Sequence, residues 1–368
     1  MNRHRRSLTT LARCLQGSAP GNTAATIEPT EWMSVFQAAN DHLLTPALWH
    51  ALISSGRFRS LPADAAEYLA TLYLLNGERN GVLRRQAIEL IGALNERDIV
   101  PALLKGGLAL FDGPYDDPAI RMMRDLDLLV PAPSRDQAIV VLDRLGYRLT
   151  QQYAPGHHAF GDFARSDDPG SIDLHTELVD SSHVLPAAEV WSRAEPRTID
   201  GARYLAPSPT DRVMHNVLHA QIHYLGSFYR GELHLQQIYE LATLARYFGP
   251  AVDWCFVHRR LAAHRLTSAL ESHLFAAHRL FGLEWPLAHP ASPRARWHFL
   301  RCEVQLDLPV LQRLAVPWGN LRGALAWHRM HALHGEVGGP LGWRCRHLLQ
   351  YLRKKGIGAT VGRLMRLQ

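Results

Sequence analysis

Two aspartates separated by one leucine lie inside an otherwise apolar run, and this pair most constrains the fold. The run reads Arg-Asp-Leu-Asp-Leu-Leu-Val over residues 124–130. Residues two apart in a β-strand point to the same side of the sheet, so Asp125 and Asp127 project together and the leucines beside them turn toward a core. Two carboxylates in an apolar strand repel each other and lose hydration unless a cation compensates them. We therefore expect a Mg²⁺ site that meets substrate phosphates, with Mn²⁺ as a substitute.

Two flanking motifs extend this pair into a site. Residues 104–107 read Leu-Lys-Gly-Gly, which predicts the end of a strand and a turn of small residues, Gly106 and Gly107. Such a turn lets backbone N–H groups approach a triphosphate closely. Residues 172–175 read Ile-Asp-Leu-His and predict another strand, whose Asp173 would complete a two-metal clamp with the first pair.

Several basic side chains near these motifs are candidates for binding phosphate. They are Lys105, Arg121, Arg124 and His175. Lysine and arginine form charge-assisted hydrogen bonds with phosphate oxygens. Structural roles are the alternative. The lysine would then be a surface residue at a strand end, and the arginines would pair with Asp116 and Asp117. The histidine would be a core residue whose hydrogen bonds are made within the protein.

The hydrophobic pattern switches from helical to strand spacing and back along the chain. Residues 31–96 are helical in pattern, and 65–95 reads as one long helix. We interpret Asn76, Arg79 and Asn80 on it as a polar solvated face; contact with a neighbouring segment is the alternative. Strands are expected at 99–104, 125–130 and 172–178, edge strands at 147–150 and 159–164, and a helix at 134–145. Helical patterns return at 211–225, 233–248, 253–265 and 267–280.

These elements predict an α+β fold with a small mixed-sheet core. We expect the α/β core at 99–206, helical regions at 29–98 and 207–368, and a flexible, solvated arm at 1–28. The 368 residues are 47% hydrophobic and 20% charged, which is typical of folded globular proteins. The net charge of +6 favours an anionic substrate but does not by itself indicate nucleic-acid binding.

At this point the sequence resembles a known group, the uncharacterised nucleotidyltransferase family of the DNA polymerase beta-like superfamily. The residues that carry the resemblance are 104–107, Tyr115, Arg121, 124–130 and 172–175. It extends to the helix bearing Asn76 and Asn80 and to the helical C-terminal half. Tyr115 itself is interpreted as a packing residue.

The resemblance implies transfer of a nucleoside monophosphate from an NTP such as ATP, with release of pyrophosphate. It implies Asp125, Asp127 and Asp173 as catalytic metal ligands, and a role in bacterial natural-product or polysaccharide biosynthesis. The acceptor is unassigned, and we favour a small molecule or peptide over RNA. Two features depart from the pattern: the gap between Gly107 and Asp125 exceeds the usual superfamily interval, although it fits this family, and Gln237 stands where members commonly carry aspartate.

Other functions remain as alternatives. They are a tRNA- or protein-modifying nucleotidyltransferase and a non-catalytic nucleotide-binding scaffold protein. The presence of all three carboxylates favours an enzyme. An EF-hand is excluded because no glycine or terminal glutamate follows at loop spacing. The P-loop, serine-hydrolase and zincin motifs GxxxxGK, GxSxG and HExxH are not found.

Two further patterns carry weaker signals. Asp211, His215, His219 and His223 recur every four residues, and we interpret them as a polar stripe facing a cleft or solvent, because about 18 Å of helix is too long for one zinc ion. A basic C-terminal run is interpreted as a solvated helix face, with membrane-surface or nucleic-acid contact as alternatives; it comprises Arg344, Arg346, Arg353, Lys354, Lys355, Arg363 and Arg366.

Cysteine spacing and hydropathy bear on the compartment. Cys14, Cys255, Cys302 and Cys345 are dispersed without a CxxC pair, which predicts reduced, buried thiols in a cytoplasmic protein. No run reaches the roughly 18–20 apolar residues of a membrane span.

Overall fold

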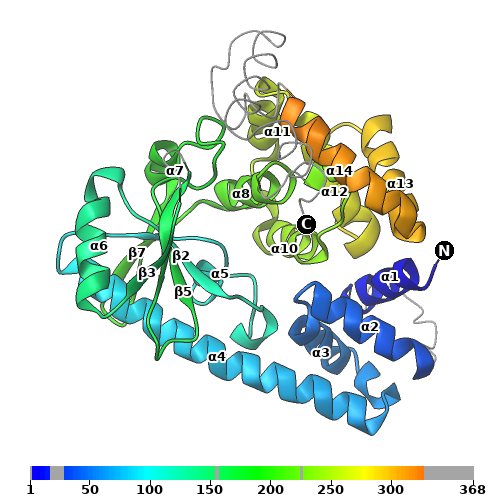
Figure 1. Cartoon of the computed structure of the whole chain (residues 1–368), viewed down its shortest axis with the longest axis horizontal. Coiled ribbons are helices and arrows are strands. Elements are labelled where there is room, and N and C mark those ends of the chain that lie inside the picture. Colours follow the sequence, from blue (N-terminus) through cyan, green and yellow to red (C-terminus); the bar gives the residue numbers. More distant parts are fainter. Residues whose placement is uncertain (1, 17–28, 154–156, 224–226, 327–368) are drawn as a thin grey trace, which may run out of the picture.

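A seven-stranded mixed sheet forms the centre of the α/β part of the molecule (Figure 1). The computed structural model describes residues 2–16, 29–153, 157–223 and 227–326. The spatial order of the strands is β3 (Arg148–Gln152), β4 (Ala159–Ala164), β5 (Ser171–His175), β2 (Asp125–Leu129), β1 (Ala102–Leu103), β7 (Ala202–Ala206) and β6 (Glu195–Ile199). β2 runs parallel to β5 and β1 parallel to β7, whereas the other neighbours are antiparallel. The predicted α+β class with a mixed sheet is confirmed.

Helices cover the two faces of the sheet differently. One face, which carries the buried Leu126 and Leu128, packs in one hydrophobic core with α4 (Ala63–Asn95) and α6 (Arg135–Arg144). The opposite face packs, through Leu129, in a core shared with the C-terminal helices α8 (Pro209–Gln221) and α10 (Leu235–Phe248). The aspartates of β2 therefore lie on the side of the C-terminal helices.

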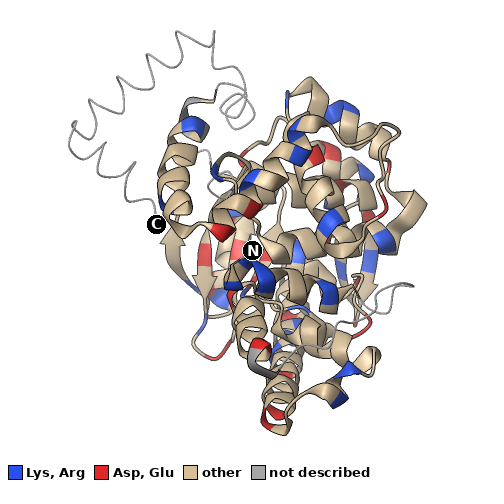
Figure 2. Cartoon of the chain, turned by 90° about the vertical axis from the view of Figure 1, so that its right-hand side faces the viewer, with Lys and Arg blue, Asp and Glu red and all other residues tan. Residues whose placement is uncertain are grey.

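The N-terminal and C-terminal helices form one body (Figure 1). Its other helices are α1 (Arg3–Leu15), α2 (Pro29–Asp41), α3 (Thr45–Ser54), α9 (Ser227–Arg230), α11 (Trp254–Ala263), α12 (Thr267–Phe281), α13 (Pro293–Asp307) and α14 (Pro309–Leu325). The Gln16 side chain donates to the Leu280 carbonyl at 2.7 Å, and Arg5 pairs with Asp307 at 2.7 Å. On the side shown in Figure 2, basic and acidic residues are interspersed along the described helices.

The expectation of a solvated arm over residues 1–28 is wrong for residues 3–15. These residues form α1, whose Leu8, Leu11 and Leu15 are buried in the helical core. The spacing of three and four residues between the leucines places them on one face of the helix, which explains the burial. Residues 17–28 of the predicted arm lie outside the described residues.

The long helix α4 supports the segment that precedes β2. Asn76 and Asn80 are buried, and their side-chain amides donate to the carbonyls of Ala119 (2.7 Å) and Pro118 (2.6 Å). Arg79 donates to the Met123 carbonyl and, at 2.9 Å, to that of Pro169. The interpretation of this face as solvated is therefore wrong. Its asparagine side-chain amides donate hydrogen bonds to backbone carbonyls of a segment that is not paired with a strand.

Two local predictions also need correction. The glycine pair does not form a turn before a helix, because Gly106 and Gly107 lie in the first turn of α5 (Lys105–Ala109). β4 is not an edge strand, since β3 and β5 flank it. The hairpin β6–β7 was not predicted, and α7 (Ala187–Arg193) precedes it.

Three of the cysteines lie in the described part of the chain. Cys14 and Cys302 are buried free thiols, as expected, whereas Cys255 is exposed. Cys345 and the basic C-terminal run lie outside the described residues. Among the described helices, none combines the length and hydropathy that a membrane crossing needs.

Candidate active site

The register between β2 and β5 brings two of the predicted aspartates together. Asp127 pairs directly with Asp173 across the parallel strands, and Asp125 pairs with Ser171 two residues earlier. Asp125 therefore lies on the same face of β2 as Asp127, while Leu126 and Leu128 are fully buried on the other face. The predicted alternation along this strand is confirmed.

His175, at the end of β5, connects the two opposed carboxylates. Its Nε2 lies 3.1 Å from Asp127 Oδ1 and 3.0 Å from Asp173 Oδ2, and its Nδ1 lies 3.2 Å from the Glu177 carbonyl oxygen. Burial alone would lower the pKa of His175, but the charge of Asp173 and the hydrogen bonds to both carboxylates raise it to about 9. A protonated imidazole therefore lies between two acids, with oxygen acceptors at both of its nitrogens.

Lys105 supplies a second cation to Asp127. Its Nζ lies 2.6 Å from Asp127 Oδ1, and its backbone has a φ of +40°, a left-handed conformation that is uncommon outside glycine. Burial opposes ionisation of Asp127, but Lys105 and His175 hold the pKa of that carboxyl well below its usual range. Asp127 is therefore a fixed anion.

The negative charges of the other two aspartates are less fully compensated by neighbouring cations than that of Asp127. Burial, and then the charge of Asp127, raises the pKa of Asp125 to about 6. Burial would also raise the pKa of Asp173, but His175 outweighs it and the pKa is lowered. Asp173 Oδ1 is buried, and within the described residues it has no hydrogen-bond partner. A buried anionic oxygen without a partner is costly, so the donor set fits a divalent cation with oxygen ligands.

Arg121 has a different partner from the expected local acids. Its Nη2 lies 3.2 and 3.1 Å from the carboxylate oxygens of Glu240 on α10, and both side chains are 11% exposed. A Cβ on Gly106 would overlap the Arg121 guanidinium, so the close approach of this side chain requires glycine at position 106. Tyr115 packs at the edge of the helical core, as expected.

The neighbouring acids and Arg124 have separate roles. Asp117 accepts hydrogen bonds from the Tyr73 hydroxyl (2.6 Å) and the Ala119 amide (2.8 Å), which holds the start of the 118–120 turn. Arg124 is exposed, and so is Asp116. Pairing of either arginine with these acids is therefore not observed among the described contacts.

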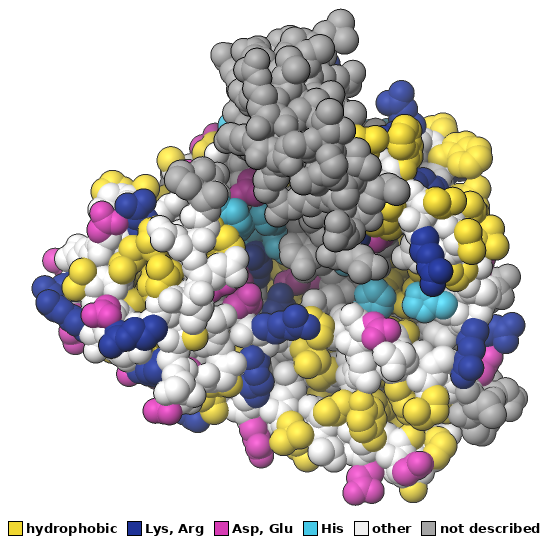
Figure 3. Space-filling model, viewed as in Figure 1, with side chains coloured by type: hydrophobic (Ala, Val, Ile, Leu, Met, Phe, Trp, Pro, Cys, Tyr) yellow, Lys and Arg dark blue, Asp and Glu magenta, His cyan; other side chains and the backbone are white. Residues whose placement is uncertain are grey.

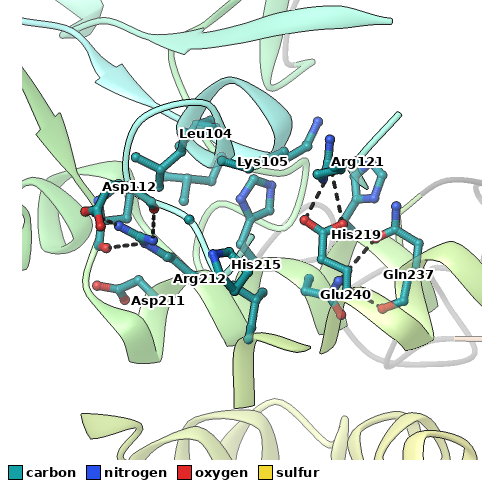
Figure 4. Close-up of a pocket in the computed structure, with 18 residues that line it drawn as sticks. Leu104, Lys105, Asp112, Arg121, Asp211, Arg212, His215, His219, Gln237 and Glu240 are labelled. Atoms are coloured by element: carbon teal, nitrogen blue, oxygen red, sulfur yellow. Dashed lines mark hydrogen bonds and ion pairs between the residues drawn. The ribbon is translucent and has the colours of Figure 1, made fainter. Parts of the chain in front are cut away.

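A narrow cavity of about 50 Å³ opens beside Lys105, between α5 and the helices α8 and α10 (Figure 4). Lys105, Arg121, His215, His219, Gln237 and Glu240 are among the residues that line it. In Figure 3, histidine and charged side chains gather in the hollow between the sheet and the helices. The cavity therefore adjoins the face of the sheet that carries the aspartates.

Asp211, His215 and His219 of the predicted stripe lie on α8 and line this cavity, whereas His223 follows the end of the helix. Asp211 is buried and pairs with Arg193 at 2.7 Å, so it has a structural role. Burial, and then the charge of Lys105, holds the pKa values of His215 and His219 well below the usual range, so both rings are neutral. His223 pairs with Asp180 at 3.0 Å. The stripe thus divides into a structural acid, two cavity-lining rings and one residue beside Asp180.

The glutamine that departs from the family pattern lines the same cavity. Asn216 Nδ2 lies 3.2 Å from the Gln237 carbonyl oxygen and 3.3 Å from its Oε1. Glu240, one turn further along α10, supplies the nearby carboxylate. Sequence reasoning missed Glu240, although a single acid among the apolar residues of α10 was a usable signal.

The chain matches one known protein family. A family model described as "Uncharacterised nucleotidyltransferase" matches residues 28–282. The chain belongs to this family. Neither the curated proteins nor the solved structures give a match. In this nucleotidyltransferase family member, the matched region contains every strand of the described sheet and α8 and α10.

Proposed function

We propose that this chain transfers a nucleoside monophosphate from an NTP to an acceptor and releases pyrophosphate. An acceptor hydroxyl or phosphate oxygen attacks the α-phosphorus; the new P–O bond forms as the bond to the pyrophosphate oxygen breaks. The proton of a hydroxyl acceptor leaves to Asp173 or to water. The observation that carries the proposal is the opposition of Asp127 and Asp173 across β2 and β5, with Asp125 on the same face.

The metal that this chemistry needs fits the residues present. Asp125, Asp127 and Asp173 would hold Mg²⁺ or Mn²⁺, which would neutralise the phosphate charge as pyrophosphate leaves. Asp173 Oδ1, which has no hydrogen-bond partner in the described part of the chain, and the raised pKa of Asp125 both support a cation at this place.

The chain's own cations organise the carboxylates around the substrate. Lys105 donates to Asp127 and has two further N–H groups for phosphate oxygens. His175 fixes the orientation of Asp127 and Asp173 by its hydrogen bonds to both. Arg121 is a positioning residue in this proposal, because its guanidinium packs against Gly106 and is held by Glu240. Arg124 is exposed at the start of β2, where it can meet phosphate.

Label transfer tests the proposal. The purified chain is incubated with each α-³²P-labelled NTP, Mg²⁺ or Mn²⁺ and a cell extract, and the labelled product is identified. We expect transfer by the wild type and by Asp136→Asn, an exposed carboxylate on α6, and none by Asp127→Asn. Equal transfer by Asp127→Asn would refute the proposal.

The same experiment separates the acceptor classes. The net charge of +6 is modest, so we favour a small molecule or peptide, as would suit natural-product or polysaccharide biosynthesis. A tRNA acceptor would give ribonuclease-sensitive label and acceptor binding that weakens steeply with salt. A scaffold protein would bind NTP without releasing pyrophosphate.

A further inference from the structure

His158 lies beside the candidate metal site but belongs to a different loop. It immediately precedes β4, and its carbonyl oxygen accepts hydrogen bonds from the Thr176 and Glu177 amides at 3.0 and 3.1 Å. These bonds tie the His158 loop to the end of β5. The imidazole is 5% exposed, and its centroid lies 4.9 Å from that of His175.

Asp180 orients the His158 ring. Asp180 Oδ1 lies 2.7 Å from His158 Nδ1, and Asp180 Oδ2 lies 3.0 Å from His223 Nδ1. A histidine that donates its Nδ1–H to a carboxylate keeps the lone pair of Nε2 for a metal ion. Burial lowers the pKa of His158 to about 4, although Asp180 opposes this, so the ring is neutral, as a metal ligand must be.

The oxygen that lacks a partner belongs to the same group of residues. Asp173 Oδ2 contacts His175, whereas Oδ1 is the buried oxygen without a partner in the described part of the chain. Ligand atoms of His158, Asp173 and His175 all lie within 4.8 Å of one another. Both ring nitrogens of His175 already have oxygen partners: Asp127 and Asp173 at Nε2, and the Glu177 carbonyl at Nδ1. His158 Nε2 and Asp173 Oδ1 therefore remain as the ligand atoms of this group.

We propose that His158 binds, through Nε2, the divalent ion held by the aspartates, and that this mixed imidazole–carboxylate site prefers transition ions such as Mn²⁺ or Co²⁺ to Mg²⁺. Mg²⁺ favours oxygen ligands, whereas an imidazole nitrogen raises affinity for first-row transition ions. The inference rests on the metal site of the proposed function and specifies its ion class. In it, Asp180 is the positioning residue for His158.

Electron spin-echo envelope modulation on the full-length protein loaded with Mn²⁺ alone tests this ligand. Directly bound imidazole gives a ¹⁴N signal that carboxylates do not. We expect the signal in the wild type and its loss in His158→Asn, together with at least a tenfold weaker Mn²⁺ affinity. His157→Gln is the matched control: its ring centroid is 4.1 Å from that of His158, and it should keep the signal.

The outcomes separate this inference from the proposed function. Mn²⁺ binding that Asp173→Asn abolishes, without any ¹⁴N signal in the wild type, overturns the His158 ligand and leaves the aspartate site standing. Loss of the signal in His157→Gln and not in His158→Asn also overturns it. Tighter binding of Mg²⁺ than of Mn²⁺ by the wild type overturns the ion preference. No Mn²⁺ binding at all overturns both the inference and the metal site.

Discussion

Asp127 and Asp173 occupy the same register position on the adjacent parallel strands β2 and β5, and one ring nitrogen of His175 lies within 3.1 Å of a carboxylate oxygen of each. Residues 46 positions apart in the numbering are thereby fixed relative to each other by backbone pairing. The bridging imidazole then sets their side-chain orientation. This arrangement leads to the predictions below.

Replacing the bridging imidazole should change the dependence of stability on pH. In the metal-free protein with EDTA, His175→Gln should lower the free energy of unfolding at pH 6 by on the order of 3 kcal/mol, given about 1.4 kcal/mol per pKa unit. The folded-state pKa of His175, about 9, exceeds the usual 6.5. The stabilisation is therefore complete below about pH 6.5 and lost as the pH rises through 9. Urea titrations of both proteins from pH 6 to 10 measure this; a stability difference independent of pH would contradict it.

The Lys105 ammonium should matter for NTP binding and turnover. Lys105→Met removes a charged hydrogen bond to Asp127, which corresponds to about 1.5–3 kcal/mol, or roughly ten- to a hundredfold in kcat/KM. Label-transfer rates at varied NTP concentration measure the loss. Lys105→Arg keeps the charge and should retain more activity than the methionine variant. Unchanged kcat/KM in Lys105→Met would contradict a role of Lys105 in NTP binding or turnover.

The Arg121–Glu240 pair should contribute mainly to stability. Glu240→Gln leaves a buried guanidinium without its counter-charge, which should cost about 3–5 kcal/mol in the free energy of unfolding. Asp143→Asn is the matched control, because its pair with Arg148 is exposed and should change stability by less than about 1 kcal/mol. Denaturant titration compares the two variants, and equal effects would contradict the structural role.

A methyl group at Gly106 should displace the arginine. Gly106→Ala places Cβ against the Arg121 guanidinium and 3.0 Å from Met123 Cβ, so we expect a loss of about 1–3 kcal/mol in the free energy of unfolding. Gly92→Ala, in α4, meets no atom within 4 Å and should instead stabilise by about 0.5–1 kcal/mol. If both alanines stabilise, the close approach at Gly106 is wrong.

The sequence was informative where local periodicity determines structure. The alternation of Asp125–Leu128 sets which side chains face the core, and it predicts the paired acids without knowledge of the neighbouring strand. The seventeen residues between Gly107 and Asp125 carry no such pattern, so the partners of Arg121 and of the α4 asparagines were not predicted. A hydrogen bond to a distant carbonyl has no signal in one sequence.

Other misses had usable signals. Asp200 and Gly201 both have positive φ at the turn of the β6–β7 hairpin, and an Asp-Gly pair between alternating runs is typical of such a turn. The leucines of α1 had helical spacing. The Asp180–His158 contact joins two loops. It could not be predicted from the sequence, because neither residue lies in a periodic pattern.

A crystal structure with Mn²⁺ and an α,β-methylene NTP analogue tests the central proposal most directly, since anomalous scattering locates the ion. We expect the ion in contact with Asp125, Asp127 and Asp173, and the analogue's phosphates beside Lys105. An ion or analogue bound elsewhere, with no ion at the three carboxylates and Asp127 still in contact with Lys105 and His175, would contradict the proposed reaction.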